Sequence, residues 1–203
     1  MPQLYIVRHG NTFDKGDRVT RVGARTDLAL STSGQTQARA LAEHFRDEGI
    51  HFGGAIAGPL KRTRETAETI VADQPPGLEI RIEDFLREVD YGPDENQPEA
   101  AVVDRIGQAA LDAWEAEATP PPGWKVDPDA LIQDWKNFFA EVGAFTSETN
   151  VLAVTSNGIA RFALLAAGAD GEGHSLKLKT GAYGILKIRP DGSAYLEDWN
   201  VSP

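Results

Sequence analysis

Three short polar segments carry the side chains best suited to chemistry. Residues 8–12 read Arg-His-Gly-Asn-Thr and follow an apolar run, and residues 61–64 read Lys-Arg-Thr-Arg at the start of an expected helix. Residues 155–158 read Thr-Ser-Asn-Gly between an expected strand and an expected helix. Arginine side chains and the free N–H groups of a helix N-terminus both bind anions, and a histidine beside them can act as a nucleophile. The sequence therefore predicts a phosphate site centred on His9.

The charge of the chain limits its partners. The 203 residues carry a formal net charge of −11, and such a surface repels nucleic acid and anionic membranes. It also repels phosphate esters, so a phosphate site has to be a local cluster of arginines. A run of about 18 apolar residues, as needed for a membrane span, is absent from the sequence. We expect a small-molecule phosphate ester as the ligand, with neither nucleic acid nor membrane as a partner, and we leave the oligomeric state open.

Cysteine is absent, which excludes disulfides, thiolate catalysis and thiolate-ligated metals. It also fits a reducing compartment. The first residues pass straight into an apolar run without a basic region or a cleavage site, so we expect a cytoplasmic protein. The length predicts a single domain over residues 1–203.

Short apolar runs alternate with segments of helical spacing. The expected strands are residues 4–7, 55–57, 78–82 and 151–155, with a terminal hairpin of residues 183–188 and 194–196. The expected helices begin at Ser31 or Ser33, at Pro59, at residue 99 (running to 117), after Asp127 and at residue 159. This alternation predicts an α/β fold: a three-layer, open, mostly parallel sheet with helices on both faces.

Ligands of such sheets bind at the carboxyl ends of the strands. The polar segments at residues 8–12 and 155–158 both follow strands, so we expect them to meet at that edge. Residues 11–29 show no sustained periodicity and read as a long loop. Long loops in compact domains are commonly functional, so this loop is expected to border the site.

Five segments together resemble the histidine phosphatase superfamily, in the branch related to phosphoglycerate mutase. They are Ile6–Gly10, Leu30–Ala38 (Leu-Ser-x-x-Gly-x-x-Gln-Ala), Pro59–Ala67 (Pro-Leu-x-Arg-Thr-x-x-Thr-Ala), Leu86 and Glu88 with Gly92, and Val154–Gly158. Each segment alone is a weak signal, but five in the family's order span most of the chain. The resemblance implies a phosphoglycerate mutase-like fold, in agreement with the three-layer sheet predicted above.

The resemblance also implies roles for the residues. Neutral His9 would attack phosphorus and carry the group as a phosphohistidine, while Arg8 and Arg62 hold the phosphoryl oxygens. Glu88 would protonate the leaving alkoxide and then take a proton from water. The expected phosphate-binding residues are Arg8, Asn11, Thr12, Arg62, Asn157 and Gly158. The guanidinium groups supply the positive charge, so no metal or other cofactor is expected. The implied function is a phosphatase acting on small phosphorylated metabolites.

Asn157 is the main departure from the family pattern, which has a second histidine there. A charged hydrogen bond contributes about 1.5–3 kcal/mol and a neutral one about 0.5–1.5 kcal/mol. We therefore expect chemistry slowed about tenfold or more. Two smaller departures are Asn11 in place of a common glutamate and Gly58 in place of a serine. The loop after Glu88 also differs, which leaves substrate recognition open.

Several alternatives remain at this stage. Asn157 could simply cap the following helix, and His174 could supply the missing imidazole. Arg64 reads as a solvated helix charge and Arg161 as a structural residue, while Trp124 is a candidate for a residue that covers the substrate. The alternative functions are mutase-type phosphotransfer and a weakly active phosphate-binding protein.

Overall fold

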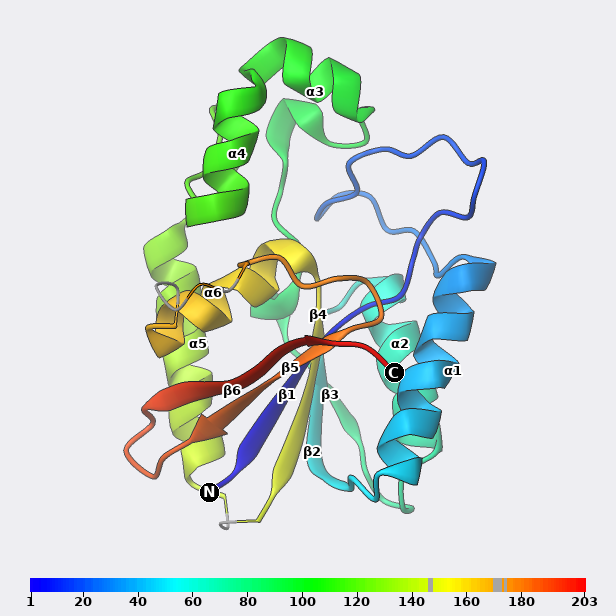
Figure 1. The fold of residues 1–203 in the computed structure, drawn as a ribbon, viewed down its shortest axis with the longest axis vertical. Coiled ribbons are helices and arrows are strands. Elements are labelled where there is room, and N and C mark those ends of the chain that lie inside the picture. The colour runs from blue at the N-terminus through cyan, green and yellow to red at the C-terminus, as the bar shows by residue number, and fades with distance from the viewer. Residues whose placement is uncertain (146–147, 170–172, 174) are drawn as a thin grey trace.

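The computed structural model describes residues 1–145, 148–169, 173 and 175–203. Within these residues, six strands form one sheet in the order β3-β2-β4-β1-β5-β6 (Figure 1). The strands are β1 (Gln3–Arg8), β2 (Phe52–Ala57), β3 (Ile80–Ile82), β4 (Asn150–Thr155), β5 (Tyr183–Ile188) and β6 (Ala194–Val201). The first four are mutually parallel, and β5 pairs antiparallel with both β1 and β6. The mostly parallel sheet and the terminal hairpin are thus confirmed.

Helices cover both faces of the sheet. Along β1, Leu4 and Ile6 belong to one buried cluster, and Tyr5 and Val7 belong to another. The helices α5 (Pro128–Gly143) and α6 (Asn157–Ala167) pack on the first face, whereas α1 (Thr32–Asp47) and α2 (Lys61–Ala72) pack on the second (Figure 1). Successive side chains of a strand point to opposite faces, so this division produces the predicted three layers.

Two further helices form a cap beyond the carboxyl ends of the strands (Figure 1, green). These are α3 (Glu99–Ile106) and α4 (Gln108–Glu117). The prediction of one helix over residues 99–117 was wrong, because Gly107 interrupts it with a φ of 81°. Glycine reaches positive φ without steric cost, which allows the chain to change direction there.

The helix starts place polar residues at the sheet edge. Ser31 caps α1, its Oγ accepting from the N–H of Gly34 at 3.2 Å. The helix α2 begins at Lys61, so the prediction that it begins at Pro59 was wrong by two residues. The helix α6 begins at Asn157, earlier than predicted, with Ser156 at its N-cap. In the part of the chain that the structure describes, no helix is both long and apolar enough to cross a membrane.

Candidate active site

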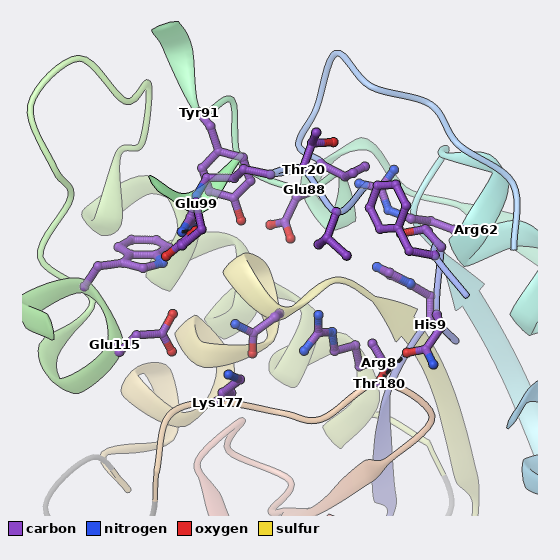
Figure 2. A pocket seen from close by; sticks show the side chains of 18 residues that line it. Arg8, His9, Thr20, Arg62, Glu88, Tyr91, Glu99, Glu115, Lys177 and Thr180 are labelled. Atoms are coloured by element: carbon purple, nitrogen blue, oxygen red, sulfur yellow. Dashed lines mark hydrogen bonds and ion pairs between the residues drawn. The ribbon is translucent and has the colours of Figure 1, made fainter. Parts of the chain in front are cut away.

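A cavity of about 610 Å³ opens at the carboxyl ends of β1 and β4 (Figure 2). The predicted site residues that line it are Arg8, His9, Asn11, Thr12, Arg62, Glu88 and Asn157. Of the residues predicted to be catalytic or to bind phosphate, Gly158 is the one that is not part of the lining. The structure therefore brings together side chains from β1, α2, α6 and the segment after β3.

His9 follows β1, where its N–H donates to the Thr155 carbonyl at 3.1 Å. Its Nδ1 lies 2.7 Å from the Gly10 carbonyl oxygen. Because a carbonyl can only accept, Nδ1 carries the hydrogen, and Nε2 of the neutral ring keeps its lone pair. Burial, followed by the positive charges of Arg62 and Arg8, holds the pKa of His9 well below its ordinary value. His9 is thus neutral near pH 7, with Nε2 able to act as a nucleophile.

The turn after His9 packs tightly against the start of α1. A Cβ on Gly10 would lie 2.3 Å from the Gly34 carbonyl oxygen, and a Cβ on Gly34 would lie 2.0 Å from the Asn11 carbonyl oxygen. The Gly10 N–H also donates to Thr66 Oγ1 of α2 at 3.3 Å. This close approach requires glycine at both positions. The contacts therefore fix the backbone that carries His9.

Two arginines flank His9: Arg62 is buried and Arg8 is half-buried. Arg8 Nη1 donates to the Leu178 carbonyl at 2.7 Å, and Arg62 donates to the carbonyls of Thr26 and Gly23 at 2.9 and 3.2 Å. Both Nε atoms are buried, and neither has a hydrogen-bond partner among the described residues. A buried donor without a partner costs about 1–3 kcal/mol. An anion with several acceptor oxygens would satisfy both groups, so this pair favours an oxyanion ligand.

The Glu88 carboxylate points into the same cavity (Figure 2). Its Oε1 accepts from the Val89 N–H at 2.9 Å, and its Oε2 accepts from the Gly158 N–H at 3.3 Å. A Cβ at Gly158 would come within 2.2 Å of Oε1, so a larger residue there would displace the Glu88 carboxylate. The Gly158 N–H thus contacts the carboxyl group that would act as the acid, and phosphate contact by Gly158 stays a prediction.

Asn157 is the first residue of α6. Its Oδ1 accepts from the Leu178 N–H at 2.9 Å, and Ser156 holds the N-cap position. The alternative that Asn157 caps this helix was therefore wrong. With Oδ1 committed to Leu178, Nδ2 is the polar atom that the side chain can offer to a ligand.

Asn11 and Thr12 border the cavity on the side of α1. The Asn11 Oδ1 accepts from Thr180 Oγ1 at 2.6 Å, and its Nδ2 donates to Ser33 Oγ at 3.2 Å. One amide hydrogen of Asn11 remains for a ligand, since the group carries two. Phosphate contact by Asn11 and Thr12 stays a prediction.

The wall opposite His9 contains residues that the sequence did not single out. They are Arg21, Tyr91, Glu99, Trp114, Glu115 and Lys177. The Arg21 guanidinium lies over the rings of Tyr91 and Trp124 and pairs with Glu99 at 2.6 Å. Trp124, expected to cover the substrate, lies outside the lining, and its Nε1 donates to Asp94 at 2.7 Å. No periodicity marks Arg21, because it belongs to a loop.

The remaining sequence alternatives concern charged residues and one glycine. Arg64 is exposed and pairs with Glu68 at 3.7 Å, which confirms it as a solvated helix charge. Arg161 is fully buried and donates to the Trp114 carbonyl, in agreement with a structural residue. A Cβ at Gly58 would lie 2.6 Å from the Leu86 carbonyl oxygen, so the serine of the family pattern has no room there. His174 lies outside the described residues.

A neutral histidine between two arginines, at the carboxyl edge of a three-layer sheet, is an arrangement suited to phosphoryl transfer. The family model "Histidine phosphatase superfamily (branch 1)" matches residues 4–202, and the chain belongs to that superfamily. Over 92 residues it is 41% identical to a protein named "Probable phosphoglycerate mutase GpmB" from Enterobacter sp. (strain 638). That alignment spans 45% of this chain and 40% of the relative, so the match covers less than half the length of this curated relative.

Solved structures share the whole fold. A mycobacterial glucosyl-3-phosphoglycerate phosphatase matches with a TM-score of 0.80 and 22% identity, over 99% of both chains. Phosphoserine phosphatase from Entamoeba histolytica, solved with 3-phosphoglyceric acid, matches with a TM-score of 0.76 and 16% identity, over 100% of this chain and 98% of that one. At these identities the likeness establishes a phosphoglycerate mutase-like fold.

Proposed function

We propose that this protein hydrolyses small phosphate monoesters through a phosphohistidine on His9. One observation carries the proposal: a neutral, buried histidine with its hydrogen held on Nδ1 lies beside two arginines whose buried Nε donors have no partner among the described residues. This arrangement provides a nucleophile together with a binding site for phosphoryl oxygens.

In the first step, His9 Nε2 attacks phosphorus. The P–N bond forms as the ester P–O bond breaks, and Glu88 gives its proton to the leaving alkoxide. In the second step, water attacks phosphorus, Glu88 takes a proton from that water, and the P–N bond breaks. Inorganic phosphate leaves, and both His9 and Glu88 return to their starting protonation states.

The guanidinium groups of Arg8 and Arg62 neutralise charge on the transferred group, in place of a metal ion. Asn157 adds a neutral donor from Nδ2, and Asn11 and Thr12 complete the wall near the phosphoryl group. A neutral hydrogen bond is weaker than the charged one of a histidine, so we expect reduced turnover compared with an imidazolium at this position.

The substrate class is a small phosphorylated metabolite. The cavity of about 610 Å³ lies within the usual range for small-molecule sites, and its far wall mixes acidic, basic and aromatic side chains. The solved relatives carry the names of phosphatases for different phosphate esters, which supports the class without selecting one member. We also propose that residues 1–203 act as one catalytic unit in the cytoplasm.

Mutase-type phosphotransfer is the enzymatic alternative, because two curated relatives that match 45% of this chain carry the name of a probable phosphoglycerate mutase. Asn157 favours a second alternative, in which the phosphate site binds its ligand but turns over poorly. The three functions differ in where the phosphoryl group goes: to water, to another hydroxyl, or nowhere.

A panel of phosphorylated metabolites, with His9→Ala as the control, separates them. We expect release of inorganic phosphate from at least one group of esters by the wild-type protein, and none by His9→Ala. Movement of phosphate between hydroxyls of one substrate would favour the mutase. Binding of inorganic phosphate without hydrolysis of any ester would favour the binding protein.

A further inference from the structure

Residues 175–182, directly before β5, lie against the proposed phosphoryl site. We name residues 175–182 the clamp loop. The side chains of Leu176 and Leu178 are buried in the core, while Lys177 between them lines the cavity (Figure 2). The clamp loop therefore alternates its side chains as a strand does, with one face on the core and the other on the site.

The Leu178 residue contacts two site residues through its backbone. Its N–H donates to Asn157 Oδ1 at 2.9 Å, and its carbonyl accepts from Arg8 Nη1 at 2.7 Å. An N–H can only donate and a carbonyl can only accept, so these bonds set the orientation of both side chains. They turn the Asn157 amide so that Nδ2 is available, and they fix the fork of Arg8.

Asn200 of β6 holds the peptide groups on both sides of Leu178. Its Nδ2 donates to the Lys177 carbonyl at 2.7 Å, and its Oδ1 accepts from the Lys179 N–H at 2.8 Å. Asn200 has a φ of 63°, a left-handed conformation that asparagine tolerates better than most residues. One side chain thus fastens the segment whose central residue orients Arg8 and Asn157.

We infer that Asn200 is a positioning residue of the phosphoryl site, acting through Leu178 on Arg8 and Asn157. This inference rests on the proposed function. Arg62 provides an internal contrast, because its guanidinium is held by Thr26 and Gly23 of another loop. Asn200 should therefore couple to Asn157 and not to Arg62.

The variant Asn200→Gly tests this without backbone strain, since glycine accepts the positive φ. Asn200→Asp keeps an acceptor for Lys179 and loses the donor to Lys177. Asn137→Ala is the matched control, because Asn137 is exposed on α5 and accepts only from Gln133 in the described part of the chain. The readouts are the Kd of orthovanadate, kcat and KM with an aryl phosphate, and Tm.

We expect Asn200→Gly to weaken vanadate binding and lower kcat by about tenfold, because small displacements of catalytic groups are costly. Asn200→Asp should fall between this variant and the wild type, and Asn137→Ala should match the wild type. Unchanged vanadate affinity and kcat in Asn200→Gly would overturn the inference.

A double-mutant cycle separates positioning from general stability. Groups that share a contact give non-additive effects, whereas distant groups add. We expect non-additive effects on vanadate affinity when Asn200→Gly is combined with Asn157→Ala, and additive effects when it is combined with Arg62→Lys. Additivity in both pairs would show that Asn200 acts on the fold alone. A wild-type protein that neither binds vanadate nor hydrolyses esters would instead reject the proposed function itself.

Discussion

Two irregular segments approach the phosphoryl site from opposite sides and hold it in different ways. The long loop of residues 11–29 provides the carbonyls of Gly23 and Thr26 that bind Arg62. The clamp loop provides the Leu178 peptide groups that bind Arg8 and Asn157. In both loops, backbone carbonyl groups accept hydrogen bonds from an arginine. Each guanidinium is therefore held in position before a ligand binds.

The anchors of the two loops differ. Glu95, which follows the 3₁₀ turn Gly92–Asp94, accepts through Oε1 from the N–H groups of Gly23 and Arg25 and from Thr26 Oγ1, at 2.9–3.1 Å. The clamp loop is instead held by leucines in the core and by Asn200 of the sheet. Near Arg62 the long loop thus has a carboxylate close to the cap among its anchors, whereas the clamp loop is held by the core and the sheet.

The two arginines should have comparable effects despite their different anchors. We expect Arg8→Met and Arg62→Met each to lower kcat/KM by about 10²–10³, because each removes a charged donor from the transition state. Steady-state kinetics with an aryl phosphate measures both. Near-normal activity in either variant would show that the replaced arginine does not bind the phosphoryl group.

The anchor of the long loop should have the next largest effect. Glu95→Ala removes the acceptor of three hydrogen bonds near Arg62, so we expect kcat/KM to fall about tenfold to a hundredfold. Amide hydrogen exchange should accelerate in residues 20–26 and stay unchanged in the clamp loop. Glu95→Gln retains an acceptor oxygen and serves as the milder control. Equal acceleration in both loops would contradict their separate anchoring.

Substitutions of Asn157 test the part of the site that the clamp loop orients. Asn157→Ala should lower kcat about tenfold, which corresponds to the loss of one neutral hydrogen bond. In Asn157→His we expect a faster reaction at pH values where the new imidazole is protonated, and a new ionisation in the pH–rate profile. An unchanged rate and profile in the histidine variant would show that residue 157 lies away from the phosphoryl group.

The depressed pKa of His9 predicts a smaller effect on stability. Its pKa in the unfolded chain is about 6.5, and burial beside Arg62 and Arg8 holds the folded value well below this. Below pH 6.5 the unfolded state therefore binds the proton first. The free energy of unfolding should decrease as pH falls toward the folded pKa, by at most about 1.4 kcal/mol per pH unit from this group. Urea unfolding of wild type and His9→Gln should show a shallower pH dependence in the variant.

The sequence predicted the sheet and its layers, and strand ends and helix starts indicated most of the predicted residues that line the cavity, whereas Glu88 was found only through the family resemblance. The helical pattern of residues 99–117 did not reveal the break at Gly107, because a single glycine within such a pattern is often tolerated. Leu178 contacts Arg8 and Asn157 through its backbone, and the side-chain amide of Asn200 contacts the backbone beside Leu178. These contacts join segments that are apart in the sequence, and no residue type marks them. Arg21 was equally hidden, because its stacking on Tyr91 depends on how a loop folds back.

The two loops have the predicted effects on catalysis only if His9 receives the phosphoryl group. The direct test is rapid acid-free quenching of the protein during turnover of a ³²P-labelled ester, followed by peptide mapping. We predict label on His9 that is stable in base and labile in acid, and its absence in His9→Gln. Hydrolysis by the wild-type protein with no trapped label on His9, or with label on another residue, would contradict the account.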